Sequence, residues 1–253
     1  MATRSFAFEG ALFKPLTAAA FEPRVGSFYQ FGARKLRLDI GASIDFAELY
    51  KSDSAEWRMA ADFFTYTRLR SQNHFKFPVE TSDYYFGVNT TFNANMFGTG
   101  FTGRIRLAHI SSHLVDGYST DGVFWKKPFV YSREFFDVAV AKQLGGFRPY
   151  LGMNFLFSTQ PRDNGAFAPQ IGVDYEKELA AHLNLIAGID SRITEVKSKF
   201  RTSNSAQIGL LFKPVEHAGI SLNGFFYDGR SMHGMFYRER DSYAGFGFQV
   251  HFY

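Results

Sequence analysis

The sequence predicts an all-β protein, a closed antiparallel transmembrane β-barrel of about twelve strands. Apolar and polar residues alternate along many segments, as in the run LRLDIGASIDFAEL at 36–49. These segments are about 10 to 14 residues long, enough for a tilted strand to cross a bilayer and longer than typical soluble strands of about 5 or 6. Aromatic residues make up 18% of the chain and supply side chains that favour strands.

The alternation defines the candidate strands in chain order. In each of them, apolar side chains occupy one parity, while polar or small side chains occupy the other. The strands are expected near 24–31, 36–46, 57–63, 84–88, 101–114, 136–140, 151–157, 171–175, 183–189, 206–212, 220–222 and 244–252. An even number fits a closed bacterial barrel, and the aromatic ending FGFQVHFY resembles the terminal strand of such barrels.

The predicted connections also alternate in length. Short ones fall near 93–98, 144–146, 179–181 and 214–217, and longer ones near 115–128, 159–165, 197–204 and 228–242. Short periplasmic turns and long outer loops are typical of outer-membrane barrels. A soluble sandwich would show the same alternation with its apolar face inward, but the strand lengths favour the membrane.

The chain divides into an N-terminal segment, 1–22, and the barrel, 23–253. Residues 1–22 show no clean period, so they form either a periplasmic segment, including a short helix, or a segment inside the lumen. No apolar run follows Met1, so we expect the mature form of an exported protein, without a signal peptide, in the bacterial outer membrane. The sequence contains no run of about 20 apolar residues, so no transmembrane helix is predicted.

Composition excludes several classes of function. The net charge is only +4 and the charged residues are interspersed, which argues against nucleic-acid binding. Without cysteine, there is no disulfide, thiolate nucleophile or cysteine metal site. The expected partners are outer-membrane lipids, with lipopolysaccharide as a candidate because the basic residues of the outer loops suit phosphates.

The run RIRLAHISSH determines which side chains face the membrane. Two arginines would not face hydrocarbon, so Arg104 and Arg106 are expected in the lumen. His109 and Ser111 have the opposite parity and should therefore face the lipid, toward the outer leaflet. The simpler alternative is that His109 and Ser111 belong to an interfacial belt, where small polar side chains meet lipid headgroups.

The following strand supplies an acid of the same parity. If the 115–128 loop closes symmetrically, residues that pair across the hairpin sum to about 243, which places Glu134 opposite His109. This predicts a catalytic group in which Ser111 is the nucleophile, His109 the base and Glu134 the group that orients the imidazole. A metal site on His109 and His113 is the alternative. We expect no cofactor, with calcium as the one ion considered.

The His-x-Ser pattern at 109–111 resembles that of outer-membrane phospholipase A, a twelve-stranded barrel, and of the lipid A 3-O-deacylases. Both families have an active site that faces the membrane near the outer leaflet. The resemblance implies that His109 is a base and Ser111 a nucleophile, with Glu134 in the place of the deacylase acid. The chain departs from the phospholipase at Ser112 and His113, where that family has Asn-Gly.

Most of the chain resembles an uncharacterised bacterial outer-membrane barrel family. The resemblance lies in the runs LFKPLTAAAFEPR, HISSHLVD and YSRE. It implies fold and location and carries no activity.

Two classes of function therefore stay open. One is an acyl hydrolase that acts on phospholipid or lipid A. The other is a non-enzymatic barrel, either a narrow solute channel or an assembly partner in the envelope. Lumen arginines could line a pore, but acids such as Asp39, Asp62 and Asp137 share that interior, and mixed signs favour a salt-bridged filling.

Overall fold

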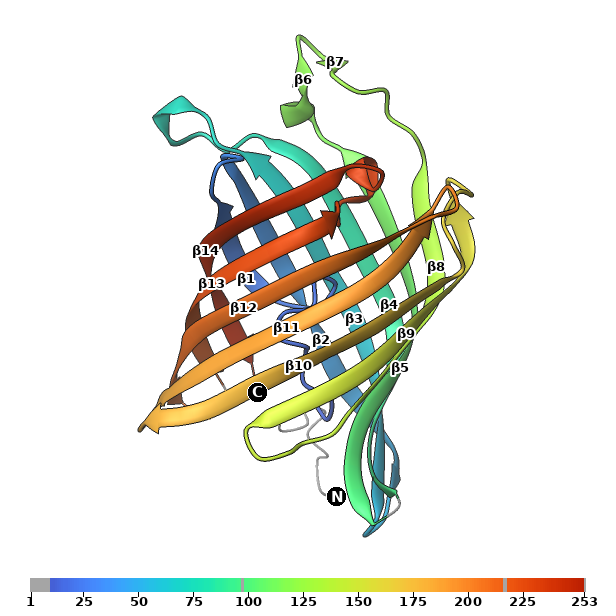
Figure 1. Ribbon diagram of the computed structural model, residues 1–253, viewed down its shortest axis with the longest axis vertical. Helices are drawn as coiled ribbons and strands as arrows, with labels where there is room; N and C mark the ends of the chain where they lie inside the picture. Colours follow the sequence, from blue (N-terminus) through green and yellow to red (C-terminus); the bar gives the residue numbers. More distant parts are fainter. Residues whose placement is uncertain (1–9, 97, 216–217, 253) are drawn as a thin grey trace, which may run out of the picture.

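In the computed structural model, which describes residues 10–96, 98–215 and 218–252, twelve strands close into one antiparallel barrel (Figure 1), and the predicted fold class is confirmed. The barrel strands are β1 (Val25–Gln30), β2 (Lys35–Lys51), β3 (Ala55–Arg70), β4 (Val79–Met96), β5 (Thr99–Leu114), β8 (Tyr131–Ala141), β9 (Phe147–Gln160), β10 (Phe167–Ala180), β11 (Leu183–Val196), β12 (Lys199–Val215), β13 (Ala218–Arg230) and β14 (Arg240–Phe252). β6 (Ser119–Thr120) and β7 (Val123–Phe124) form a separate small hairpin.

Each barrel strand pairs with its neighbour in the chain, and β1 closes the ring. β1 pairs antiparallel with both β2 and β14, so that Val25 lies opposite Val250. β1 therefore begins where β14 ends. We call this the turn end of the barrel, and the opposite end, which carries the β6–β7 hairpin, the loop end (Figure 1).

The strands extend further than the alternation predicts. The expected strand at 57–63 is the central part of β3, and the expected strand at 84–88 is the central part of β4. The long loop expected at 197–204 is wrong. β11 and β12 pair up to Val196 and Lys199, and the two residues between them form a tight turn with positive φ. The polar run that suggested a loop continues the ladder beyond the apolar band of the barrel.

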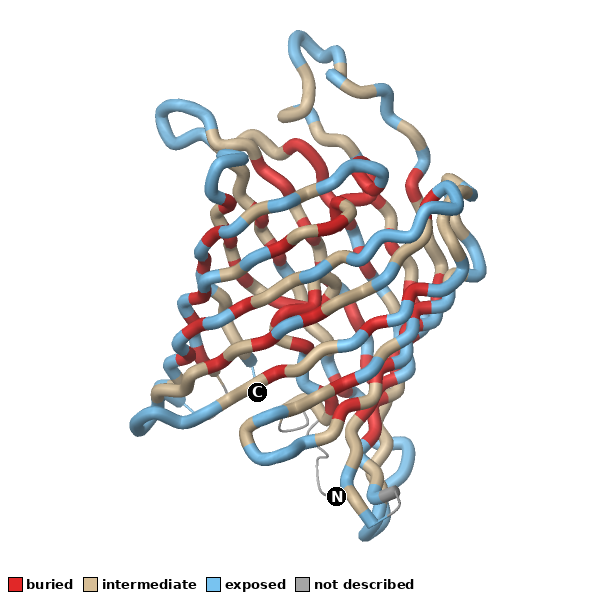
Figure 2. The backbone as a smooth tube through the Cα atoms, viewed as in Figure 1, coloured by how far each residue is buried: buried red, intermediate tan, exposed pale blue. Residues whose placement is uncertain are grey.

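Apolar residues face outward and charged residues face inward. Ile40, Ile105 and Leu107 are exposed, whereas Arg104 and Arg106 are almost fully buried. Figure 2 shows buried and exposed residues alternating along the strands. Arg104 and Arg106 thus face the lumen, as the sequence predicts. No helix of the described residues is long and apolar enough to cross a bilayer.

The chain before β1 lies inside the barrel. Among the described residues 10–24, Phe13, Leu16 and Ala19 are buried. The Thr17 N–H donates to Asp174 Oδ1 on β10 (3.0 Å), and Ser205 on β12 donates its hydroxyl to the Ala18 carbonyl (2.7 Å). The segment is thus tied to the barrel wall within the lumen, without forming a helix. The prediction for residues 1–9 lies outside the described residues.

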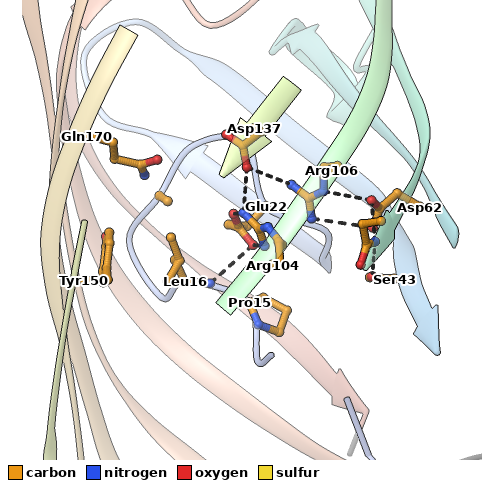
Figure 3. Close-up of polar contacts among 12 residues, drawn as sticks. Pro15, Leu16, Glu22, Ser43, Asp62, Arg104, Arg106, Asp137, Tyr150 and Gln170 are labelled. Atoms are coloured by element: carbon orange, nitrogen blue, oxygen red, sulfur yellow. Dashed lines mark hydrogen bonds and ion pairs between the residues drawn. The ribbon is translucent and has the colours of Figure 1, made fainter. Parts of the chain in front are cut away.

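One buried carboxylate anchors this segment (Figure 3). Arg104 Nη1 donates to Glu22 Oε2 at 2.7 Å and its Nη2 to the other oxygen, while the Leu16 N–H donates to Glu22 at 3.3 Å. Asp137 lies 3.3 Å from Arg104, and Arg106 pairs with Asp62 at 2.8 Å. Charges of both signs thus fill the lumen with ion pairs.

A second segment closes the loop end from inside. Residues 231–237, between β13 and β14, include the short 3₁₀ turn η3 (Gly234–Phe236) and are buried. Asp83 on β4 accepts from the Gly234 N–H (2.7 Å) and lies 2.8 Å from His233 Nδ1. The lumen is therefore occupied at mid-height by 10–24 and covered at the loop end by 231–237.

Candidate functional site on the outer face of the barrel

The predicted site residues lie on three adjacent strands. β5 contributes His109 and Ser111, β8 contributes Glu134, and β4 flanks β5 on its other side. Because side chains two residues apart share a face, His109 and Ser111 lie on the same outer face as the exposed Ile105 and Leu107. β5 ends at Leu114, so the site is near the loop end.

His109 and Glu134 are joined. The β5–β8 register pairs them directly, as the symmetric hairpin predicts, and His109 Nδ1 lies 2.8 Å from Glu134 Oε1. A carboxylate can only accept, so the ring donates through Nδ1–H, which in the neutral imidazole leaves the lone pair on Nε2. Nε2 is the atom that a general base would use.

Two serines complete the surroundings of the carboxylate. Ser132 donates its hydroxyl to Glu134 Oε1 at 2.8 Å, and Ser158, opposite Glu134 on β9, also hydrogen-bonds to it. Neither serine is a site residue predicted from the sequence. Ser132 could have been found from its two-residue spacing to Glu134, whereas Ser158 requires the β8–β9 register.

The imidazole is held from the other side by an aromatic ring. Phe86, opposite His109 on β4, stacks on it with ring centroids 4.7 Å apart and an interplanar angle of 28°. His109 thus lies against Phe86 and its Nδ1 faces Glu134. The side chains of His109 and Glu134 are 28% and 32% exposed, so this polar pair is half-buried on the outer face.

Ser111 lies beside the pair without joining it. It is opposite Tyr84 on β4 and Ser132 on β8. No hydrogen bond between Ser111 and His109 is found among the described residues. Residues at this spacing lie about 6.5 to 7 Å apart along a strand, so a rotamer change or a bound substrate has to bring the hydroxyl to Nε2.

The alternative metal site lacks ligands. His113 shares the face of His109, but its ring contacts Tyr84, with centroids 5.9 Å apart. Within residues 10–96, 98–215 and 218–252, no three His, Asp or Glu side chains gather as a metal site would require. The outer site is thus built from one His, one Glu and serines.

Its fold and apolar exterior place the chain in the class of outer-membrane β-barrels. A model of the family described as "Protein of unknown function (DUF1207)" matches residues 2–252, and the chain belongs to that family. No match is found among curated proteins.

Solved structures show the same fold at low sequence identity. Outer-membrane phospholipase A from Escherichia coli matches with a TM-score of 0.60 and 12% identity over 90% of this chain and 92% of that one. The Salmonella typhi phospholipase, a dimer with bound calcium, matches with a TM-score of 0.59 and 13% identity over 94% and 93%. At these identities the likeness is one of fold.

Proposed function

We propose that this barrel hydrolyses an ester-linked acyl chain of a membrane lipid, either a phospholipid or lipid A. Ser111 is the nucleophile, His109 the general base and Glu134 the group that orients the imidazole. The observation that carries the proposal is the 2.8 Å hydrogen bond between His109 and Glu134 on the lipid-facing surface.

An ionisable pair is costly in this position. A charged side chain on the lipid face of a barrel costs roughly 2 to 4 kcal/mol at the bilayer midplane, and less near the interface. Ionisable residues at membrane depth therefore point to function by default. The exposed Ile105 and Leu107 on the same strand face would hold the acyl chains that the site has to reach.

The chemistry follows from the free Nε2 lone pair. Nε2 takes the hydroxyl proton of Ser111 as its oxygen bonds to the ester carbonyl carbon, and Glu134 stabilises the imidazolium through Nδ1–H. The tetrahedral intermediate collapses, the C–O bond to the alcohol breaks, and His109 gives the proton to the leaving oxygen. Water, deprotonated by His109, then releases the fatty acid and restores Ser111.

The test measures fatty acid release from phospholipid and from lipid A by the refolded barrel, with calcium or with a chelator. Ser111→Ala and His109→Ala should each abolish release, whereas Ser191→Ala, on the outer face of β11, should not. The heat-dependent gel shift of a closed barrel verifies folding of every variant. A folded wild type that releases no fatty acid from either lipid, with or without calcium, overturns the proposal.

Ser132 requires its own variant, because it also contacts Glu134. As a group that only helps to hold the carboxylate, it should tolerate Ser132→Ala with a partial loss of rate. Complete loss in Ser132→Ala with activity kept in Ser111→Ala would make Ser132 the nucleophile and refute the assignment of Ser111.

The competing channel function is less well supported. The N-terminal segment lies in the lumen, bound to Arg104 on β5 and to Asp174 on β10, and 231–237 covers the loop end. Planar-bilayer conductance of the full chain would favour a channel over the hydrolase.

A further inference from the structure

A second polar site lies inside the barrel, at the loop end. A cavity of about 80 Å³ is bounded on one side by Ala20 and Phe21 of the N-terminal segment and on the other by Met232 and Tyr237 of the 231–237 segment. About 10 to 15 Å³ of such space accommodates one water molecule, so the cavity has room for a group of several atoms.

The inward-facing Arg133 of the YSRE run lines this cavity. Ser132 and Glu134 face outward, so Tyr131 and Arg133 face inward. The Arg133 guanidinium lies 4.9 Å from the ring centroid of Tyr131 and 5.8 Å from that of Tyr237, which also lines the cavity. These rings hold the guanidinium without neutralising it.

The inward-facing Ser112 binds the 231–237 segment that covers the cavity. Its hydroxyl accepts from the Met235 N–H at 3.1 Å. A Cβ on Gly234 would lie 2.3 Å from the Tyr131 ring and 2.6 Å from the Ser112 Cβ, so only glycine permits this close approach. The segment that covers the cavity is therefore fixed against β5 and β8.

Two arginines at this cavity have unused donors. Arg133 donates Nη2 to Asn164 Oδ1, and Arg230 donates Nη2 to the Lys199 carbonyl at 2.8 Å, but the Nε of each is buried without an acceptor. Neither arginine forms an ion pair with any acid that the structure describes. Buried donors of this kind normally find a partner.

The local charge balance is positive. Arg230 is repelled by Arg133 and Arg201 and attracted by Asp163. Asp163, however, already pairs with Arg238 at 2.6 Å and accepts from the Tyr237 hydroxyl at 2.7 Å.

The acids that line the cavity itself are Asp190 and Glu195. Asp190 accepts from Tyr150 and Gln170, and the Glu195 side chain packs over Gly165. Three arginines, Arg133, Arg192 and Arg230, thus line the cavity against two acids. Arg192 pairs with Asp137 at 3.7 Å, whereas Arg133 and Arg230 have no ion-pair partner among the described acids.

We infer that this cavity binds a phosphate group, held by Arg133 and Arg230. Guanidinium groups from two strands present several fixed donors to a multi-oxygen anion, and arginine is the preferred side chain for such recognition. The neighbouring Ser203 hydroxyl, which accepts from the Arg230 N–H at 3.1 Å, can donate to the same anion. This inner site is independent of the proposed hydrolase on the outer face.

The test is calorimetry, in which inorganic phosphate is titrated into the folded full chain in a neutral detergent. The ionic strength is kept constant by replacing chloride with phosphate. Arg133→Gln and Arg230→Gln should each weaken binding about tenfold or more, as expected for loss of a charge-assisted hydrogen bond. Arg240→Gln removes an exposed arginine that pairs with Asp228 and should leave binding unchanged.

A second arm distinguishes the source of the phosphate. Bilayers with and without phosphatidic acid replace the detergent, and the unfolding temperature is the readout. An Arg133-dependent rise with phosphatidic acid assigns a lipid headgroup, and a rise only with dissolved phosphate assigns a soluble ligand. Absence of binding in both arms, or binding that Arg133→Gln and Arg230→Gln do not weaken while the variants retain the gel shift, overturns the inference.

Discussion

At the scale of single residues, the HISSH and YSRE runs each serve two faces of the barrel. His109, Ser132 and Glu134 form a hydrogen-bonded group on the lipid side. Ser112, which follows Ser111, and Arg133, between Ser132 and Glu134, face the lumen. Strand alternation alone causes this division, since successive side chains point to opposite faces.

The Glu134→Gln variant tests the role of the carboxylate. An amide can offer its NH₂ group to His109 Nδ1 and stabilise the other tautomer, which places the proton on Nε2, where a base needs a lone pair. Fatty acid release should fall about 100-fold or more, with an unchanged unfolding temperature because the side chain is half-exposed.

The control for this variant is Glu178→Gln, which changes an exposed glutamate on β10. A Glu134→Gln barrel that hydrolyses lipid at the control rate would show that the hydrogen bond to His109 has no catalytic role.

At the scale of elements, two segments depend on buried or partly buried charges. The N-terminal segment is anchored by Glu22 on Arg104, and the loop between β9 and β10 is joined to 231–237 and its neighbour Arg238 by Asp163. Their energetics differ because the first pair is buried, whereas the second contact is near solvent.

Glu22→Leu should destabilise the barrel strongly. It leaves the buried Arg104 with only the longer contact to Asp137, and loss of one partner from a buried pair costs about 3 to 5 kcal/mol. Urea unfolding in detergent measures the change. The double variant Glu22→Leu/Arg104→Leu should recover much of the loss, and equal destabilisation of single and double variants would contradict the pairing.

Acid should loosen the Asp163 contact. Desolvation raises the pKa of Asp163, but hydrogen bonds from Tyr237 and Arg238 outweigh it and hold the pKa below its usual range. A carboxylate whose pKa is lowered in the folded state stabilises the structure at pH values above its ordinary pKa of about 3.9. This contribution is lost as the pH falls through the pKa of the folded state.

Hydrogen exchange of 231–237 at neutral pH and below about pH 4 checks this expectation. In Asp163→Asn the exchange should already be faster at neutral pH and should change less on acidification. Equal acid sensitivity in the variant and the wild type would assign the effect to other groups.

At the scale of the whole molecule, the lumen holds two segments, 10–24 at mid-height and 231–237 at the loop end. Deletion of residues 1–22 removes the mid-height segment, and Asp83→Ala releases the cover at His233 and Gly234. In planar bilayers the full chain and each single variant should conduct little, and the combination should conduct clearly. A deletion that conducts as well as the combination would show that 231–237 does not close the loop end.

Much of the fold was predictable from the sequence. The two-residue period follows directly from strand geometry, so it identified the strands, the lumen charges and the outer-face placement of His109 and Ser111. Polar stretches were less informative, because ladder hydrogen bonds continue outside the apolar band regardless of side-chain polarity. For this reason the sequence predicts a long loop where the structure has the tight β11–β12 turn at Lys197 and Ser198.

The residue pattern alone predicts the all-β barrel, its inward and outward faces, and the pairing of His109 with Glu134 through a symmetric hairpin. Three features are visible only in the folded barrel: residues 10–24 lie in the lumen on Glu22 and Arg104, Ser158 joins the outer site, and Arg133 and Arg230 line one cavity. The difference arises from the sequence separation of the residues in contact. Alternation and hairpin register are local properties of the chain, whereas these contacts join residues far apart in sequence and exist only once the barrel has closed.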